Sequence, residues 1–192
     1  MILSQLTSPF GYLFIKGINA KKKYDVYIPL FFTVLTIVFL YFANNLDLNL
    51  IVSKTGLISD ISSFIGNLPG FYIAALAAIA TFNREQIDKP LISDGTSPYI
   101  VNKIVDSNGK EHQTEETITR RMFLCFLFSF LTAESIILVI INKFASVVIL
   151  SSDVFVYFSL FYIGAYFFLF WQLIISTFFG LYYLGNRIHC NS

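Results

Sequence analysis

The sequence predicts an all-α integral membrane protein with four transmembrane helices, and three observations support this fold class. First, 56% of the 192 residues are hydrophobic and only 13% are charged, whereas soluble domains carry about a quarter charged residues. Second, charges are nearly absent from four long windows and crowded between them, which is typical of a polytopic membrane protein. Third, Lys and Arg are distributed very unequally between those windows. We therefore expect a single membrane domain over residues 1–192.

The four apolar windows define the expected spans. They cover about 27–43, 61–82, 122–141 and 154–184. At ~1.5 Å per residue the last window is roughly 45 Å long and exceeds a ~30 Å hydrocarbon core. We expect this span to tilt or to project beyond the membrane.

The basic residues predict the orientation of these spans. If both termini and the loop 83–121 lie on one side of the membrane, that side holds eleven of the 13 Lys and Arg residues. The opposite side then holds only Lys54 and Lys143. Short segments rich in Lys and Arg remain cytoplasmic. Both termini and the loop are therefore expected to be cytoplasmic.

The loop 83–121 is the sizeable soluble part of the predicted protein. Tyr99–Val105 has β character and Asn108-Gly109 is a strong turn signal, so the sequence favours a small β-hairpin. From Thr114 onward the pattern turns helical, with Glu115 and Glu116 in a first turn, and we expect that helix to run into the third span. Basic residues at the two ends of the loop are candidates for docking a partner protein: Arg84, Lys89, Arg120 and Arg121.

The second span carries small residues at every fourth position. This ridge consists of Ser62, Gly66, Gly70, Ala74 and Ala78. Between helices in lipid, small residues let two backbones approach closely. Pro69 and Gly70 are also expected to loosen or kink this helix, which is tolerated at membrane depth only inside protein or beside a wet cavity. The ridge therefore predicts contact with protein, either within the chain or between copies of it.

Polar residues at similar depth in three spans suggest a mid-membrane layer. Glu134 lies twelve residues beyond Met122, about 18 Å along the helix, and Asn67 and Gln172 are expected near that depth. In one interpretation Glu134 is protonated and hydrogen-bonds Asn67 or Gln172 between helices. In the other, the layer lines a pore or acts as a protonation-sensitive switch, because intramembrane ionisable groups are candidates for function.

The N-terminal residues predict a short helix before the first span. Ser8-Pro9 is typical of a helix start, and Phe10, Leu13 and Phe14 fall on one face. Such a segment suits the membrane surface.

The residues that enzymes and metal sites require are scattered in this chain. Nucleotide-binding loops, metalloprotease motifs, paired cysteine motifs and nucleophile elbows are all missing from the sequence. His112 and His189 have no spaced partner for a metal, and Cys125 and Cys190 form no recognisable pair. We expect no enzymatic activity, no cofactor and no metal.

Four features of the sequence stand out together: the basic N-terminus, the Ala-rich stretch "AALAAIATFNRE", the following "IDKP", and the loop before the third span. In this layout the chain resembles the KwaA family, the small four-span membrane component of the two-gene Kiwa anti-phage system. This resemblance implies a multi-pass oligomer of the bacterial inner membrane that senses phage attack. It further implies a cytoplasmic partner similar to KwaB, which acts on nucleic acid, so that this chain itself contacts no nucleic acid.

Two other functions fit the same residues. One is a pore-forming or holin-like effector whose polar layer conducts when triggered. The other is a plain membrane anchor for a soluble enzyme. The prediction that we carry forward is a homo-oligomeric sensor or scaffold in the lipid bilayer that docks a cytoplasmic effector.

Overall fold

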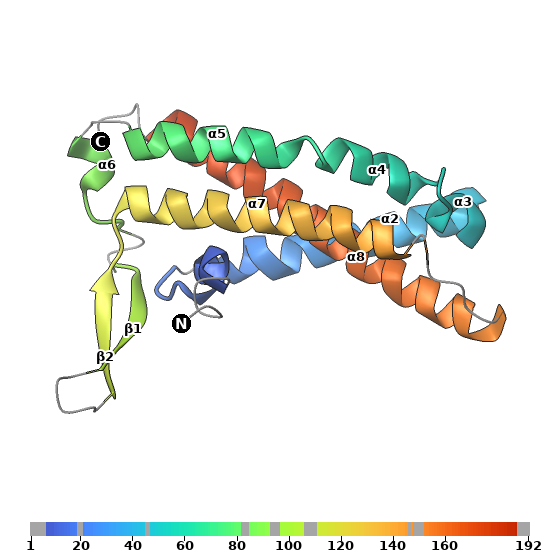
Figure 1. Ribbon diagram of the computed structural model, residues 1–192, viewed down its shortest axis with the longest axis horizontal. Helices are drawn as coiled ribbons and strands as arrows, with labels where there is room; N and C mark the ends of the chain where they lie inside the picture. Colours follow the sequence, from blue (N-terminus) through green and yellow to red (C-terminus); the bar gives the residue numbers. More distant parts are fainter. Residues whose placement is uncertain are drawn as a thin grey trace.

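The computed structural model describes residues 7–18, 21–44, 47–81, 85–92, 97–105, 111–145, 147 and 152–187. The described chain is mostly helical, and it contains four helical stretches that are long and apolar enough to cross a membrane. These run over Lys23–Ala43, Leu50–Thr81, Arg120–Ala145 and Val156–Gly185. They lie side by side in one elongated bundle (Figure 1). The chain is thus a multi-pass membrane protein.

The first and fourth spans are nearly continuous helices. A π-helical turn η2 (Lys23–Tyr27) leads into α2 (Ile28–Asn44), and α8 (Ser152–Tyr182) ends in a second π-helical turn η3 (Tyr183–Arg187). The Trp171 ring of α8 stacks on Phe32 of α2 at 4.8 Å between centroids, and its Nε1 donates to Thr36 Oγ1 at 2.9 Å. An aromatic side chain of α8 thus makes a directed contact with α2.

The second span is divided into three helices. α3 (Leu48–Val52), α4 (Leu57–Ile65) and α5 (Leu68–Thr81) follow one course along the bundle (Figure 1). A turn at Gly66–Asn67 separates α4 from α5. Pro69 explains it, because a proline has no N–H to donate to the carbonyl of Ile65, and proline is tolerated in the first turn of a new helix. The span begins earlier than the expected residue 61, and its break precedes the expected kink at Pro69 and Gly70.

A two-stranded antiparallel sheet precedes the third span. After the short helix α6 (Glu85–Asp88), β1 (Tyr99–Val105) pairs with β2 (Glu111–Thr117), in a register that places Tyr99 opposite Thr117. The expected hairpin is confirmed, and its first strand has the predicted bounds. The expected helix from Thr114 is wrong, because pairing with β1 holds this polar segment extended and overrides its local preference. α7 (Arg120–Ala145) begins only after the strand.

The helices are arranged around α7 and α8. α7 packs against α5 and α8, while α2 packs against α8. The 3₁₀ helix η1 (Ser8–Phe14) also lies against α7, near the hairpin end of the bundle (Figure 1). The buried core runs between these elements and includes Leu127, Leu131 and Leu173, which are fully covered. The short helix expected before the first span is therefore present as a 3₁₀ helix, and it packs on the outside of α7.

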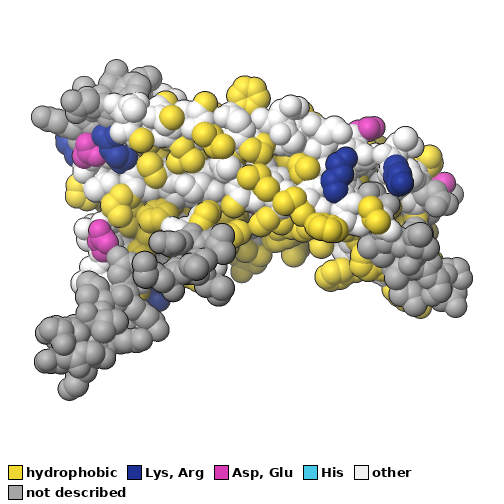
Figure 2. Space-filling view, in the orientation of Figure 1, with side chains coloured by type: hydrophobic (Ala, Val, Ile, Leu, Met, Phe, Trp, Pro, Cys, Tyr) yellow, Lys and Arg dark blue, Asp and Glu magenta, His cyan; other side chains and the backbone are white. Residues whose placement is uncertain are grey.

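The flank of the bundle is apolar. Figure 2 shows hydrophobic side chains over its middle, with the described charged side chains gathered toward the two ends. Large side chains such as Phe39, Phe71 and Phe161 are at least 66% exposed. A soluble protein would bury such residues, so this surface is suited to lipid or to another membrane protein.

Candidate functional site

A cluster of polar side chains is buried under η1, centred on Asp25 of η2. The Tyr12 hydroxyl donates to Asp25 Oδ1 at 2.9 Å, and Lys21 Nζ forms an ion pair with Asp25 Oδ2 at 3.2 Å. Gln172 Nε2 of α8 donates to the Asp25 backbone oxygen at 3.1 Å. Asp25 is only 5% exposed. The cluster therefore ties the N-terminal segment, the start of the first span and the fourth span together.

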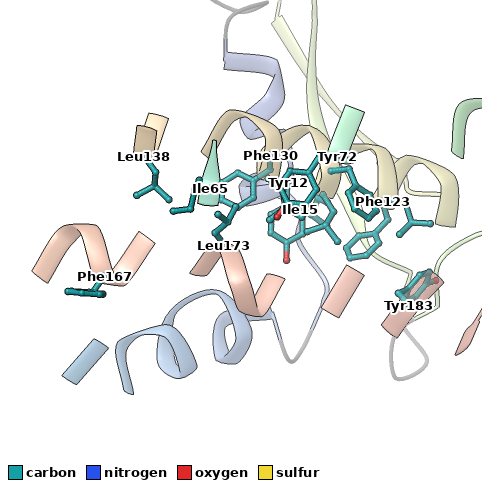
Figure 3. Packing of buried hydrophobic residues seen from close by; sticks show 14 of the residues in the cluster. Tyr12, Ile15, Ile65, Tyr72, Phe123, Phe130, Leu138, Phe167, Leu173 and Tyr183 are labelled. Atoms are coloured by element: carbon teal, nitrogen blue, oxygen red, sulfur yellow. The ribbon is translucent and has the colours of Figure 1, made fainter. Parts of the chain in front are cut away.

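Aromatic packing places Tyr12 in this cluster. Its ring is 3% exposed and stacks on Phe130 of α7, with 5.3 Å between centroids, and it also meets the Phe123 ring at 6.0 Å. Figure 3 shows Tyr12 beside Phe130 and Ile15 in the core. Gly11 allows this approach, because a Cβ at its position would lie 2.9 Å from Cε1 of Phe126. The sequence of η1 thus fits the surface of α7 closely.

Lys21 adds three interactions that close the cluster. Besides its ion pair, Lys21 Nζ donates to the Leu13 backbone oxygen at 3.1 Å and sits 4.6 Å from the centroid of the Tyr12 ring. Burial, and then the nearby Asp25 carboxylate, raise the pKa of the Tyr12 hydroxyl well above its usual value. Tyr12 therefore stays a hydrogen-bond donor. The positive charge of Lys21 balances the negative charge of Asp25.

Glu134 of α7 lies near this cluster but takes no part in its hydrogen bonds. The residue is 4% exposed, and both of its carboxylate oxygens lack a hydrogen-bond partner among the described residues. Burying an unpaired charge costs several kcal/mol, whereas a protonated carboxyl avoids that cost. Since Lys21 already balances Asp25, the arrangement favours the neutral form of Glu134. Chemically, this group is suited to holding a proton.

The three residues of the expected polar layer do not form one hydrogen-bonded group. Asn67 is exposed in the turn between α4 and α5, and its amide donates to Ser63 O of the preceding helix α4 at 3.3 Å. Gln172 is buried but bonds Asp25. Glu134 therefore has neither of the two expected hydrogen bonds. The break before α5 leaves Asn67 on the outer surface, and Gln172 is engaged by Asp25.

The predicted ridge of small residues divides at the same turn. Ser62 is 3% exposed inside the bundle, whereas Gly66, Gly70, Ala74 and Ala78 are exposed. No atom lies within 4 Å of the position that a Cβ of Gly70 would occupy. At 3.6 residues per turn, Gly70 and Ala74 point about 170° away from the buried Tyr72 and Ile79. We call the exposed surface of Gly66, Gly70, Ala74 and Ala78 the small-residue face.

Arg121, one of the four predicted docking residues, is engaged within the chain. Its Nε and Nη2 donate to the two carboxylate oxygens of Asp88 at 2.7 and 3.0 Å, and its Nη1 donates to Ile79 O at the end of α5 at 2.7 Å. This pairing lowers the pKa of the Asp88 carboxyl, so the pair is kept above that pKa and lost as pH falls through it. Arg121 therefore ties α6 and α5 to α7.

The other predicted docking residues lie near the same end of the bundle. Lys89 is exposed, and Arg120 is half-buried with its backbone N–H donating to Lys89 O at 3.1 Å. Arg84 lies outside the described residues. The loop is thus anchored to α7 at its base, and two of its predicted docking cations remain near the surface.

Sequence reasoning missed Tyr12, Lys21 and Asp25. A signal was present, since Lys21 and Asp25 are spaced i, i+4 at the start of an apolar span, which suits an ion pair on one helix face. Tyr12 carried no comparable signal. Its partners become visible only when residues far apart in sequence are brought together.

The fold and the site together define a multi-pass membrane protein with a buried polar cluster beneath its N-terminal segment. Among the described residues there is no group of three or more His, Cys, Asp or Glu side chains placed to hold a metal ion. Comparisons with protein families, curated proteins and solved structures find no match for the chain.

Proposed function

We propose that this chain is an oligomeric membrane sensor or scaffold of a bacterial anti-phage defence system and that it docks a cytoplasmic effector. The proposal combines the resemblance to the KwaA family with one structural observation. The part of the small-residue face on α5 (Gly70, Ala74 and Ala78) is exposed and directed away from the chain's own core, and no described atom lies within 4 Å of the Cβ position of Gly70. Another copy of the chain is the partner that this face suits.

Two properties of the small-residue face favour contact with protein. Gly70, Ala74 and Ala78 allow another helix backbone to approach closely, as small residues spaced by four do in membrane helices. The exposed turn at Gly66–Asn67 also interrupts the helix within a span. Irregular backbone at membrane depth is tolerated only inside protein or beside water. A neighbouring subunit would cover both features at once.

The hairpin end of the bundle supports the docking half of the proposal. The excess of Lys and Arg in the termini and the loop 83–121 favours a cytoplasmic position for this end, in the inner membrane. β1 and β2 extend away from the helices (Figure 1). An isolated two-stranded hairpin is marginally stable in water, so a partner protein would stabilise it. The resemblance implies a soluble partner similar to KwaB.

Bulky side chains on the small-residue face are expected to dissociate the assembly. Gly70→Leu and Ala74→Leu would hold apart two backbones that now approach closely, so the particle mass measured by native mass spectrometry in detergent should fall to that of the single chain. Ala165→Leu is the matched control, because Ala165 is also exposed within a span but lies on α8. An unchanged mass in both α5 variants would contradict assembly through this face.

Shortening the hairpin is expected to abolish recruitment of the soluble partner. Residues 101–115 would be replaced by Asn-Gly, which forms a tight hairpin turn and keeps Tyr99 and Thr117 in place. A soluble protein similar to KwaB, coexpressed with this chain, should then shift from the membrane to the soluble fraction by about tenfold, which is a loss of about 1.4 kcal/mol in binding free energy. Lys54→Ala, at the other end of the bundle, should leave recruitment unchanged.

Two results would favour the alternatives. Retained recruitment after hairpin shortening would contradict docking at the hairpin. Ion conductance of the purified chain in planar bilayers would instead support the pore-forming effector.

A further inference from the structure

The N-terminal segment 8–16 lies on the bundle as a separate cover. Phe10 and Tyr12 pack on Phe130 of α7, and Ile15 is buried in the core. Hydrogen bonds join the Tyr12 hydroxyl to Asp25 and the Leu13 backbone oxygen to Lys21 Nζ. Leu13 and Phe14 on the same segment are 43% and 68% exposed. The backbone hydrogen bonds at its end pair Lys16 with Tyr99 of β1. A segment held in this way can leave α7 without unwinding any helix of the bundle.

We propose that Glu134 is a proton-binding site whose occupancy controls this cover: segment 8–16 docks on α7 when the Glu134 carboxyl is protonated and detaches when it is ionised. Detachment releases one proton from the carboxyl to water, and docking takes one up. The inference concerns the single chain and does not depend on the assembly or the partner proposed above.

The position of Tyr12 links the cover to Glu134. Tyr12 stacks on Phe130, and Phe130 and Glu134 are spaced i, i+4, so they lie on one face of α7 a turn apart. With the segment docked, both Glu134 oxygens are inaccessible to water and have no hydrogen-bond partner among the described residues. Removing Tyr12 from this face would open a path for water to the carboxyl.

The charges around Glu134 determine whether a rise in pH favours or opposes docking of segment 8–16. Tyr12 of η1, Tyr72 of α5 and Asp25 at the start of the first span are close enough to Glu134 to interact with its charge, and Asp25 is paired with Lys21. The Tyr72 hydroxyl already bonds Thr177 Oγ1 at 2.6 Å. On α8, the uncharged Gln172 and Ser176 are buried and are spaced i, i+4 with Gly180, whose Cβ position would lie 3.1 Å from Leu127 of α7. On the side of α4, Asp60 is exposed to the surroundings.

An ionised Glu134 would therefore add a second negative charge beside Asp25, and no second cation is placed to balance it in the part of the chain that the structure describes. Docking is then favoured at low pH and opposed as pH rises. This direction is opposite to that of the Asp88–Arg121 pair, which is lost as pH falls. The two effects can be told apart by the sign of their pH dependence.

The cover is also connected to the hairpin. Lys16 N donates to Tyr99 O at 3.0 Å, and Tyr99 N donates to Lys16 O at 3.1 Å. Gly17 follows with φ of +87°, a conformation that side-chain-bearing residues rarely adopt, so the chain turns sharply at this point. Movement of segment 8–16 would therefore reach β1 directly.

Cysteine labelling of the whole chain measures how far segment 8–16 is docked on α7. In a background with Cys125→Ala and Cys190→Ser, Ile15→Cys reports on the docked face and Leu13→Cys on the exposed face. We take the maleimide labelling rate at Ile15→Cys divided by the rate at Leu13→Cys. This ratio cancels the pH dependence that the two thiols share. We expect this ratio to rise with pH by up to about tenfold per pH unit, the limit for one linked proton.

Variants of Glu134 test whether its ionisation causes the pH dependence of the labelling ratio. With Glu134→Gln or Glu134→Met, neither of which can ionise, the ratio should remain low at every pH between about 5 and 9. Hydrogen exchange of residues 8–16 with native Ile15 and Leu13 should follow the same trend. A ratio independent of pH with native Glu134 would overturn the proposal, as would an equal rise in the Gln and Met variants.

Discussion

Tyr12→Ala is expected to detach segment 8–16 from the bundle while the four spans remain folded. The change removes a buried ring that stacks on Phe130 and a hydroxyl that bonds Asp25. Truncating a buried aromatic residue costs about 3–5 kcal/mol. Phe10 and Ile15 keep their places in the core, but neither supplies the lost stacking or the hydrogen bond to Asp25, so most of the docking free energy of the segment should be lost. Hydrogen–deuterium exchange should become fast in residues 8–16 and stay slow in α7.

Tyr12→Phe is the matched control for that prediction. It keeps the stacked ring and removes only the hydrogen bond to a charged group, which contributes about 1.5–3 kcal/mol. Exchange in residues 8–16 should then rise less than in the alanine variant. If Tyr12→Ala instead raised exchange equally throughout α7 and α8, the segment would be an integral part of the bundle and could not act as a separate cover.

The helical part of the fold could be predicted because lipid imposes a simple rule. A span must be long and apolar, and three of the four expected windows match the described helices to within about four residues at each end. The hairpin could be predicted for a local reason as well, since β1 is rich in β-branched residues and precedes a turn signal. Both features depend on residues that are close together in sequence.

The start of the second span and the end of the loop could not be predicted in the same way. α3 and the first half of α4 lie upstream of the expected window, and polar residues in this stretch, such as Ser53 between the two helices and Asp60 in α4, lower its hydropathy. The polar strand Glu111–Thr117 has a local pattern that also suits a helix, and only its pairing with β1 decides between the two. Local preference is a weak guide where a partner strand is available.

The candidate site was predicted in part. Burial of Glu134 and Gln172 follows from polar residues in apolar windows, because such residues avoid lipid. Their partners do not follow, since Gln172 meets the backbone of a residue 147 positions away. Equal depth in the membrane could not show that Asn67 points outward, because depth fixes the position along a helix and leaves its rotation undetermined.

Glu134→Met is expected to stabilise the bundle, although it removes an ionisable group that the sequence marks as a candidate for function. Methionine is unbranched and of similar length, so it can fill the site without a cavity. It also removes two buried oxygens that lack partners among the described residues, and leaving such a group unsatisfied costs about 1–3 kcal/mol. The free energy of unfolding, measured by denaturant titration in mixed micelles, should therefore rise by about that amount.

The gain should also depend on pH. At low pH the native carboxyl is neutral in both states, so the difference between the variant and the native chain should be smallest. As pH rises, unfolding allows the native Glu134 to ionise in water, which favours its unfolded state, while the methionine variant is unaffected. Glu134→Ala controls for the lost volume and should be less stable than Glu134→Met by about 2–5 kcal/mol, because it leaves a cavity. A methionine variant less stable than the native chain would mean that Glu134 holds helices together by hydrogen bonds. In that case its carboxyl would not be free to exchange a proton with the movement of segment 8–16.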